Sequence, residues 1–219
     1  MLSDDTRHKI KNITEGNVIE GQQDSCTTIR NLLCKSYATS RSVKKDFEGK
    51  PIIKKKQAKI IESYCLNNDF WIKEIPSEER YLTCGGEAKI YLHSNNKFVI
   101  KLNDAIYYAT WLEYFNSILL HNLFFENTSY KLVGFNKESE NLYAVLEQPY
   151  VISDAQIKMN DVKNILHYNG FVNTKRQDYV HFELGLILED MHDENVLVNS
   201  DVLFFIDTVF YVTNIGSIY

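Results

Sequence analysis

The sequence predicts an α+β fold made of short antiparallel strands and a few amphipathic helices. Polar and apolar residues alternate in short runs between residues 81 and 146, which is typical of half-buried strands. Apolar residues recur every three or four positions over 58–65 and 108–119, as on the buried face of a helix. With 219 residues, 44% of them hydrophobic, and only 9 Gly and 3 Pro, the chain can bury a core and is unlike collagen or low-complexity sequences.

Charged and aromatic residues divide the chain near residue 56. Residues 1–56 carry 12 Lys and Arg against 7 Asp and Glu, whereas the remainder carries 12 against 22. The first segment also holds only 2 of the 28 aromatic residues, so it has little with which to offset the entropy of ordering. We therefore expect residues 1–56 to form a basic, flexible N-terminal arm, either a tail or a loosely docked helix.

Local signals within this arm are few. Asp24 or Ser25 can cap a short helix that runs through Leu33. Residues 48–51, Glu-Gly-Lys-Pro, are typical of a turn before the three lysines at 54–56. Those lysines belong either to a solvated linker or to a nucleic-acid patch. Because no aromatic platform accompanies them and the rest of the chain is acidic, we favour the linker and expect no nucleic-acid partner.

Cysteine spacing and hydropathy indicate in which cellular compartment the protein is expected. Cys26, Cys34, Cys65 and Cys84 are 8, 31 and 19 positions apart, which fits neither a zinc knuckle nor a redox C-x-x-C pair, so we expect four reduced thiols. No apolar run approaches the length of a membrane helix, and residues 1–5 lack the apolar region of a signal peptide. We expect a soluble, cytoplasmic protein that does not contact a membrane.

The strands are predicted from alternation and from the turns between them. Gly85-Gly86 joins the first two strands, and Asn95-Asn96 turns the chain into the third. Glu147-Gln148-Pro149-Tyr150 follows the last strand of this group as an extended connector, because a proline disfavours helix at the preceding residue. The strands are expected over 81–86, 89–93, 97–102, 130–135 and 142–146.

Two helices are predicted in this part of the chain, one before the strands and one between them. The first begins at residue 57 and carries apolar residues over 58–65. The second follows the third strand, where Asn103 or Asp104 can cap it. Its apolar stripe extends over 108–119 and should face the core.

The second half of the chain has fewer predicted elements. Ser153 or Asp154 can cap a helix to Tyr168, which Asn169-Gly170 would stop. The remaining elements are an apolar strand over 179–188, a polar loop over 189–195, and a hairpin over 196–207 that ends on Asp207.

This loop and hairpin bring three oxygen-bearing side chains near strand ends, namely Asp190, Asn195 and Asp207. Hard cations prefer such ligands, and Mg²⁺ favours one or two carboxylates together with phosphate oxygens and water. Asn195 and Asp207 suit the metal, while Asp190 can accept a hydroxyl proton. The alternative is that all three only cap turns. A zinc site of His192 with His181 is disfavoured, since no third nitrogen or sulfur ligand is nearby in the sequence.

The spacing resembles that of a known fold. Asp190-x-x-x-x-Asn195 followed by Ile206-Asp207 is similar to the catalytic loop and metal-binding Asp of the protein-kinase-like fold. Asp190-x-His192-x-x-Asn195 is especially similar to aminoglycoside-type phosphotransferases. The chain also resembles short bacterial kinase-like domains of polyvalent proteins from mobile elements, on the residues at 99–102 (Val-Ile-Lys-Leu), 147–149 (Glu-Gln-Pro) and 191–197 (Met-His-Asp-Glu-Asn-Val-Leu). The similarity extends over about residues 80–219.

This resemblance implies a compact bilobal fold with a reduced C-terminal lobe. Residues 57–146 would form the N-terminal lobe, with the leading helix, a five-stranded sheet and one further helix. Residues 147–152 would be the hinge. Residues 153–219 would form the C-terminal lobe with the catalytic loop.

The resemblance also implies a role for each site residue. Lys101 would bind the nucleotide phosphates, with Glu113 as its ion-pair partner. Asp190 would be the catalytic base or hydroxyl-orienting group, and His192 would order the loop or contact phosphate. The remaining expected assignments are Gly85 and Gly86 at the phosphates, Glu147, Gln148 and Tyr150 at the adenine edge, and Asn195 and Asp207 as metal ligands.

The implied function is ATP- and Mg-dependent phosphoryl transfer to a hydroxyl of protein Ser, Thr or Tyr, or of a small molecule. Three features depart from the pattern. Residues 84–88 lack the full G-x-G-x-x-G, Thr208-Val209 replaces Phe-Gly, and only 12 residues follow Asp207. The acceptor is therefore expected to be small, supplied by a partner protein, or carried by the N-terminal arm. The alternative is a catalytically inactive module that binds nucleotide or a partner.

Overall fold

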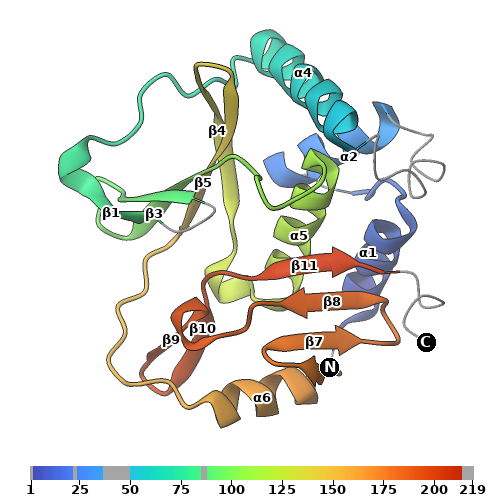
Figure 1. Ribbon diagram of the computed structural model, residues 1–219, viewed down its shortest axis with the longest axis vertical. Helices are drawn as coiled ribbons and strands as arrows, with labels where there is room; N and C mark the ends of the chain where they lie inside the picture. The colour runs from blue at the N-terminus through green and yellow to red at the C-terminus, as the bar shows by residue number, and fades with distance from the viewer. Residues whose placement is uncertain (1, 22–23, 37–49, 85–87, 214–219) are drawn as a thin grey trace. The chain divides into compact units, whose positions relative to one another are not determined.

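The computed structural model describes residues 2–21, 24–36, 50–84 and 88–213, and these residues form two compact units. Unit 1 comprises residues 1–19, 116–128 and 151–219, and unit 2 comprises residues 20–115 and 129–150. Helices and antiparallel sheets occur in both, which confirms the α+β class (Figure 1). None of the helices within the described ranges is long and apolar enough to cross a membrane.

Unit 2 contains an antiparallel five-stranded sheet in the order β1-β2-β3-β5-β4. Its core forms where Tyr91, Ile100, Leu102 and Val145 pack together. Ile100 and Leu102 are two positions apart and so point to the same face of their strand. All five strands lie close to their predicted positions. They are β1 (Tyr81–Cys84), β2 (Ala88–Leu92), β3 (Phe98–Asn103), β4 (Lys131–Glu138) and β5 (Asn141–Pro149).

Helix α5 (Trp111–Phe124) begins later than the sequence predicts. The expected caps, Asn103 and Asp104, instead accept hydrogen bonds from the backbone N–H groups of residues 105 and 106, at 2.7 and 3.0 Å, and close turns before the helix. Thr110 is the actual cap, because its hydroxyl accepts from Glu113 N at 3.1 Å. Glu113 reaches back to the N–H of residue 109 at 3.1 Å, which resembles a capping box.

Helix α4 (Lys50–Asn68) includes the three lysines that were expected in a linker. The linker prediction was wrong because the helix begins seven residues before residue 57. Pro51 is tolerated in its first turn, where no intrahelical donor is needed. Lys54 is half-buried and donates to two loop carbonyls of residues 105 and 108, at 2.6 and 3.1 Å. The predicted turn at 48–51 lies partly outside the described residues.

The expected flexible arm instead contains two helices with buried faces. Helix α1 (Asp4–Glu15) belongs to unit 1 and buries Ile10 and Ile13. Helix α2 (Ser25–Ser36) belongs to unit 2 and buries Ile29 and Leu33. Aliphatic residues at helical spacing supply the apolar surface, so the scarcity of aromatics was a misleading signal. The cap of α2 is as predicted, since Asp24 accepts from the N–H of residue 27 at 2.8 Å.

Unit 1 contains a four-stranded sheet in the order β11-β8-β7-β6 and a separate hairpin, β9–β10 (Figure 1). The hairpin is as predicted, but the strand expected over 179–188 is two strands joined by a turn at Gly185, which has φ +63°. Neither β6 nor β11 was predicted. The strands are β6 (Val172–Lys175), β7 (Asp178–His181), β8 (Leu186–Glu189), β9 (Val196–Asn199), β10 (Val202–Phe205) and β11 (Val209–Val212).

Helix α6 (Met159–Tyr168) begins six residues after the expected cap at Ser153. Ser153 and Asp154 bind the β9–β10 hairpin instead: Ser153 Oγ donates to the carbonyl of residue 198 at 3.1 Å, and Asp154 Oδ2 accepts from the N–H of residue 200 at 2.9 Å. The predicted stop is confirmed. Gly170 has φ +85°, and a Cβ there would lie 2.6 Å from His181 Nε2, so this position requires glycine.

Candidate active site

The loop that follows β8 begins with a reversal of the backbone at Asp190. Asp190 has φ +62°, a left-handed conformation that Asp tolerates better than most residues. Met191 then anchors the loop, because its side chain is fully buried and its N–H donates to the carbonyl of Gln177 at 3.1 Å. The Asp190 side chain remains 62% exposed, so its carboxylate is accessible to a substrate.

Asn195 organises the loop through its side-chain amide. Its Nδ2 donates to the backbone carbonyl of Asp190 at 2.8 Å. This contact assigns the amide orientation, because a carbonyl can only accept. The remaining polar atom of the amide, Oδ1, is the kind of oxygen that binds a hard cation.

The β9–β10 hairpin holds Asp207 close to Asn195. Val196 pairs with Phe205 in the register of the hairpin, so residue 195 lies opposite residue 206. The carbonyl of Asn195 accepts from the N–H of Ile206 at 2.9 Å and makes a longer contact of 3.5 Å with the N–H of Asp207. Asn195 therefore connects the Asp190 backbone and the Asp207 backbone within unit 1.

His192 completes this cluster. Its Nδ1 accepts from the N–H of Glu194 at 3.2 Å, so the proton of the neutral ring lies on Nε2. Nε2 is 3.4 Å from Asp190 Oδ2, close enough for this N–H to orient the carboxylate. Asn195 Nδ2 lies 3.3 Å from His192 Nε2. Because both nitrogens carry protons in this arrangement, they are in contact but do not form a hydrogen bond with each other.

The surroundings of the loop are acidic. Burial raises the pKa of Glu189, and the carboxylates of Asp178 and Asp190 raise it further. Within the described part of the chain, no group of three or more His, Cys, Asp or Glu side chains could hold a metal ion by itself. Asn195 Oδ1 and the Asp207 carboxylate are oxygens of the kind that Mg²⁺ binds together with phosphate oxygens and water.

His181, the alternative partner of His192 for zinc, has a structural environment. Its ring lies against Gly170, and its Nδ1 accepts from the N–H of Leu184 at 3.3 Å. Burial lowers its pKa, which favours the neutral ring. These contacts explain the position of His181 without a metal.

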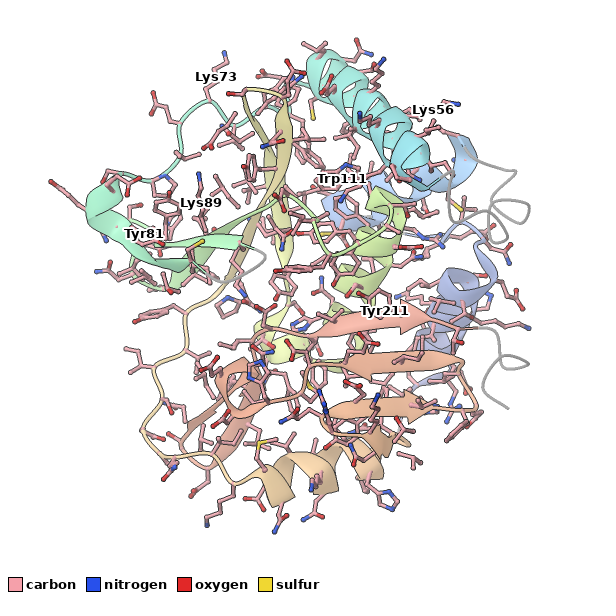
Figure 2. The ribbon with its side chains drawn as sticks, in the orientation of Figure 1. Lys56, Lys73, Tyr81, Lys89, Trp111 and Tyr211 are labelled. Atoms are coloured by element: carbon pink, nitrogen blue, oxygen red, sulfur yellow. The ribbon has the colours of Figure 1, made fainter. Side chains whose placement is uncertain are left out.

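In unit 2, Lys101 lies on β3 and is buried, with 6% of its surface exposed. Its Nζ is 3.4 Å from Tyr130 Oη and 5.2 Å from the centre of the Tyr130 ring, a cation–π distance. Sequence reasoning missed Tyr130, because nothing in the pattern relates residues 29 positions apart. Glu113 lies in the first turn of α5, the helix that begins at Trp111, which Figure 2 labels. The pairing of Lys101 with Glu113 stays a prediction.

The expected hinge residues belong to the end of β5. Glu147 lies 3.6 Å from Lys131 Nζ on the neighbouring strand, and Gln148 is buried. The N–H of Tyr150 donates to the carbonyl of Lys97 at 2.9 Å, and the two units divide directly after Tyr150. The other predicted phosphate contacts, Gly85 and Gly86, lie outside the described residues.

These features together define a class of protein. A lysine on the third strand of a five-stranded sheet, followed in the chain by the Asp190–Asn195 loop and Asp207, is the pattern of the protein-kinase-like fold. The model of the serine/threonine/tyrosine kinases found in polyvalent proteins matches residues 54–214. The chain belongs to this family. Among curated proteins, none matches it significantly.

Proposed function

We propose that the protein is an ATP- and Mg-dependent kinase that transfers a phosphoryl group to a hydroxyl acceptor. One observation carries the proposal: Asn195 holds the Asp190 backbone through its side chain and the Asp207 segment through its carbonyl. These contacts hold the backbones of the proposed proton acceptor, Asp190, and of the proposed metal ligand Asp207 close to Asn195, the other proposed ligand. Such positioning is the main contribution that a protein makes to phosphoryl transfer.

Each residue has a distinct task in this proposal. Asp190 orients the acceptor hydroxyl and takes its proton, while the N–H of His192 Nε2 fixes the rotamer of the carboxylate. Asn195 Oδ1 and the Asp207 carboxylate would hold Mg²⁺, which neutralises phosphate charge when it is bound. Lys101 adds a positive charge for the nucleotide phosphates, and Tyr130 holds its ammonium group through the ring face and the hydroxyl.

Substitution of two aspartates tests this division of labour. Asp190→Asn keeps the shape but removes the proton acceptor, so transfer from labelled ATP should fall by at least about 100-fold while Mg-ATP affinity stays within a few-fold. Asp207→Ala should weaken Mg-ATP binding itself. Asp201→Asn, in the exposed hairpin turn, is the matched control and should change neither. If the parent protein binds Mg-ATP but transfers phosphate to no acceptor, including water, it is a nucleotide-binding module instead.

The acceptor is proposed to be a protein hydroxyl, and the protein's own N-terminal segment is one candidate. Thr27 is a poor acceptor, because it is buried and its hydroxyl lies 3.1 Å from Asp24. Thr28 and the exposed Ser36 are better placed for modification. Mass spectrometry after incubation with Mg-ATP should find phosphate on the N-terminal segment, and phosphate confined to residues 57–219 would exclude this acceptor.

A further inference from the structure

The short segment that contains Asp207 is bound on both sides by residues of α5 and the turn that follows it. Thr128 Oγ1 donates to the carbonyl of Phe205 at 2.6 Å. The N–H of Phe210 donates to Ser117 Oγ at 2.9 Å. Both contacts lie within unit 1 and are buried, so water does not compete for them.

The third contact of this segment is made by His121, which is fully buried. Its Nε2 is 2.9 Å from the carbonyl of Thr128, and a carbonyl can only accept, so Nε2 carries the proton. Nδ1 of the neutral ring is then an acceptor, 2.8 Å from Thr208 Oγ1. The hydrogen-bond geometry therefore fixes both the tautomer of His121 and the direction of the Thr208 hydroxyl.

Thr208 follows Asp207 directly and is itself buried. Threonine is β-branched, so a hydroxyl fixed in direction also fixes the side-chain rotamer and restrains the backbone next to it. On its other side, Asp207 follows Ile206, whose N–H is bound to the carbonyl of Asn195. The backbone of Asp207 is consequently restrained at both of its neighbours.

Aromatic stacking adds to these polar contacts. The ring of Phe205 stacks on that of Phe125, with centroids 4.1 Å apart, and the ring of Phe210 stacks on that of Phe124 at 5.6 Å. Thr208, which directly follows Asp207, makes its side-chain hydrogen bond with His121 within this framework. Both groups are buried and polar, and burying them without this hydrogen bond would be costly.

We propose that His121 and Thr208 are positioning residues that hold Asp207 in the orientation required to bind Mg²⁺. This inference rests on the proposed function, because it takes Asp207 to be a metal ligand. Neither residue is expected to touch the metal. Residues that orient a metal ligand typically change metal affinity by about 10- to 100-fold when they are replaced.

The test compares three substitutions in the full-length chain. Thr208→Val keeps the shape and removes the hydroxyl, Thr208→Ser restores the hydroxyl, and His121→Phe keeps a ring without nitrogens. The measurement is the Mg²⁺ concentration that gives half-maximal ATP binding. We expect Thr208→Val and His121→Phe to raise this concentration about tenfold or more, and Thr208→Ser to stay within about twofold of the parent protein.

Stability is controlled by Leu166→Ala, which removes a buried side chain of α6 in the same unit. Leu166→Ala should lower the free energy of unfolding and leave the Mg²⁺ requirement unchanged. A second readout uses the metal-free protein, in which amide hydrogen exchange at residues 206–209 should be faster in Thr208→Val than in Leu166→Ala. If His121→Phe does not fold, Thr208→Val decides the question alone.

Asp207→Ala in the same assay separates the two proposals. If Asp207→Ala raises the Mg²⁺ requirement and Thr208→Val does not, the positioning role is overturned and the metal assignment stands. If neither substitution changes the requirement, the metal assignment of Asp207 fails and the positioning role fails with it. A raised requirement in both, with rescue by Thr208→Ser, supports the inference.

Discussion

Pro149 is the last residue of β5, and its backbone faces away from β3. The N–H of Tyr150 donates to the carbonyl of Lys97 on the β3 side, and successive residues of a strand point their backbone groups to opposite edges. On the outer edge, the pairing with β4 ends at Lys131 opposite Glu147. Because proline has no N–H, this edge presents a carbonyl but no donor at residue 149.

The kinase resemblance implies that the adenine base lies against residues 147–150, and a base on this edge should make Pro149→Ala tighten ATP binding. The new N–H can donate to N1 of adenine, and one hydrogen bond contributes about 0.5–1.5 kcal/mol, or about 2- to 10-fold in affinity. Calorimetric titration measures the change. With 1-deaza-ATP, which lacks the acceptor at N1, the gain should disappear. An equal gain for both nucleotides would show that the base does not meet residue 149.

Glu189 should make the stability depend on pH. Its pKa is raised in the folded protein, mainly by burial, so the folded state keeps the proton to a higher pH than the unfolded state does. The contribution of Glu189 to the free energy of unfolding is therefore fully present below the ordinary carboxyl pKa. This contribution is lost as the pH rises through the raised pKa of the folded state. The residue next to the proposed catalytic Asp190 is thus kept at a cost in stability at neutral pH.

Glu189→Gln removes this cost, so the variant should melt at a higher temperature than the parent protein at pH 7. The difference should vanish near about pH 3, where the carboxyl is protonated in both states. Thermal melts over this pH range give the answer, with exposed Glu140→Gln as the control. A difference that is the same at both ends of the range would point to packing instead of charge.

At the scale of secondary-structure elements, a residue of helix α4 accepts a hydrogen bond from one of the backbone N–H groups in the first turn of α5. The N–H of Leu112 donates to Oε1 of Gln57 on α4 at 3.1 Å, and Gln57 is buried. The next N–H, that of Glu113, is satisfied by Thr110. Lys54, one turn earlier on α4, binds the loop before α5, whereas Lys56 on the same helix is exposed (Figure 2). Gln57 of α4 and Thr110 thus together define where α5 begins.

Gln57→Leu should lower the free energy of unfolding by about 0.5–2 kcal/mol, as the loss of a cap usually does. It should also speed amide exchange at Leu112. Gln57→Glu keeps an acceptor oxygen in place and should retain most of the protection. Urea titration and hydrogen exchange measure the two effects. Equal losses in the Leu and Glu variants would mean that the contact with Leu112 contributes nothing measurable.

The elements also show how far the sequence predicts this fold. Strands such as β3 and the β9–β10 hairpin were predicted because alternation and turn residues agree there. The starts of α5 and α6 were not, since Asn103 and Ser153 suit a helix cap and a turn equally well, and tertiary contacts chose the turn. The arrangement of Asp190, Asn195 and Asp207 within unit 1 follows from short local spacings.

Contacts between residues far apart in the chain could not be predicted from the sequence. His121 and Thr208 are 87 residues apart, and Lys101 and Tyr130 are 29 apart. Each is an ordinary residue in its own segment, so only the fold reveals the pair. Single-sequence patterns report the period of one element and carry little information about which elements meet.

At the scale of the whole molecule, the N-terminal residues are part of both units. Helix α1 belongs to unit 1, where Arg7 forms an ion pair with Glu183 at 2.8 Å. Helix α2 belongs to unit 2 and packs against α4 and β4. Exposed ion pairs contribute little, so the buried faces of these helices should supply most of their stabilisation. A protein that begins at residue 57 would lose both faces as well as part of α4.

Ile13→Ala and Ile29→Ala test this dependence without shortening the chain. Both side chains are almost completely buried, so each substitution should lower the free energy of unfolding by about 2–4 kcal/mol. Ile52→Ala on α4 is the control, because that side chain is 59% exposed and should cost much less. Hydrogen exchange should localise the effects: Ile29→Ala should weaken protection in α4 and β4, and Ile13→Ala should weaken it in unit 1. If both substitutions cost no more than Ile52→Ala, residues 1–36 would behave as the flexible arm that the composition predicts.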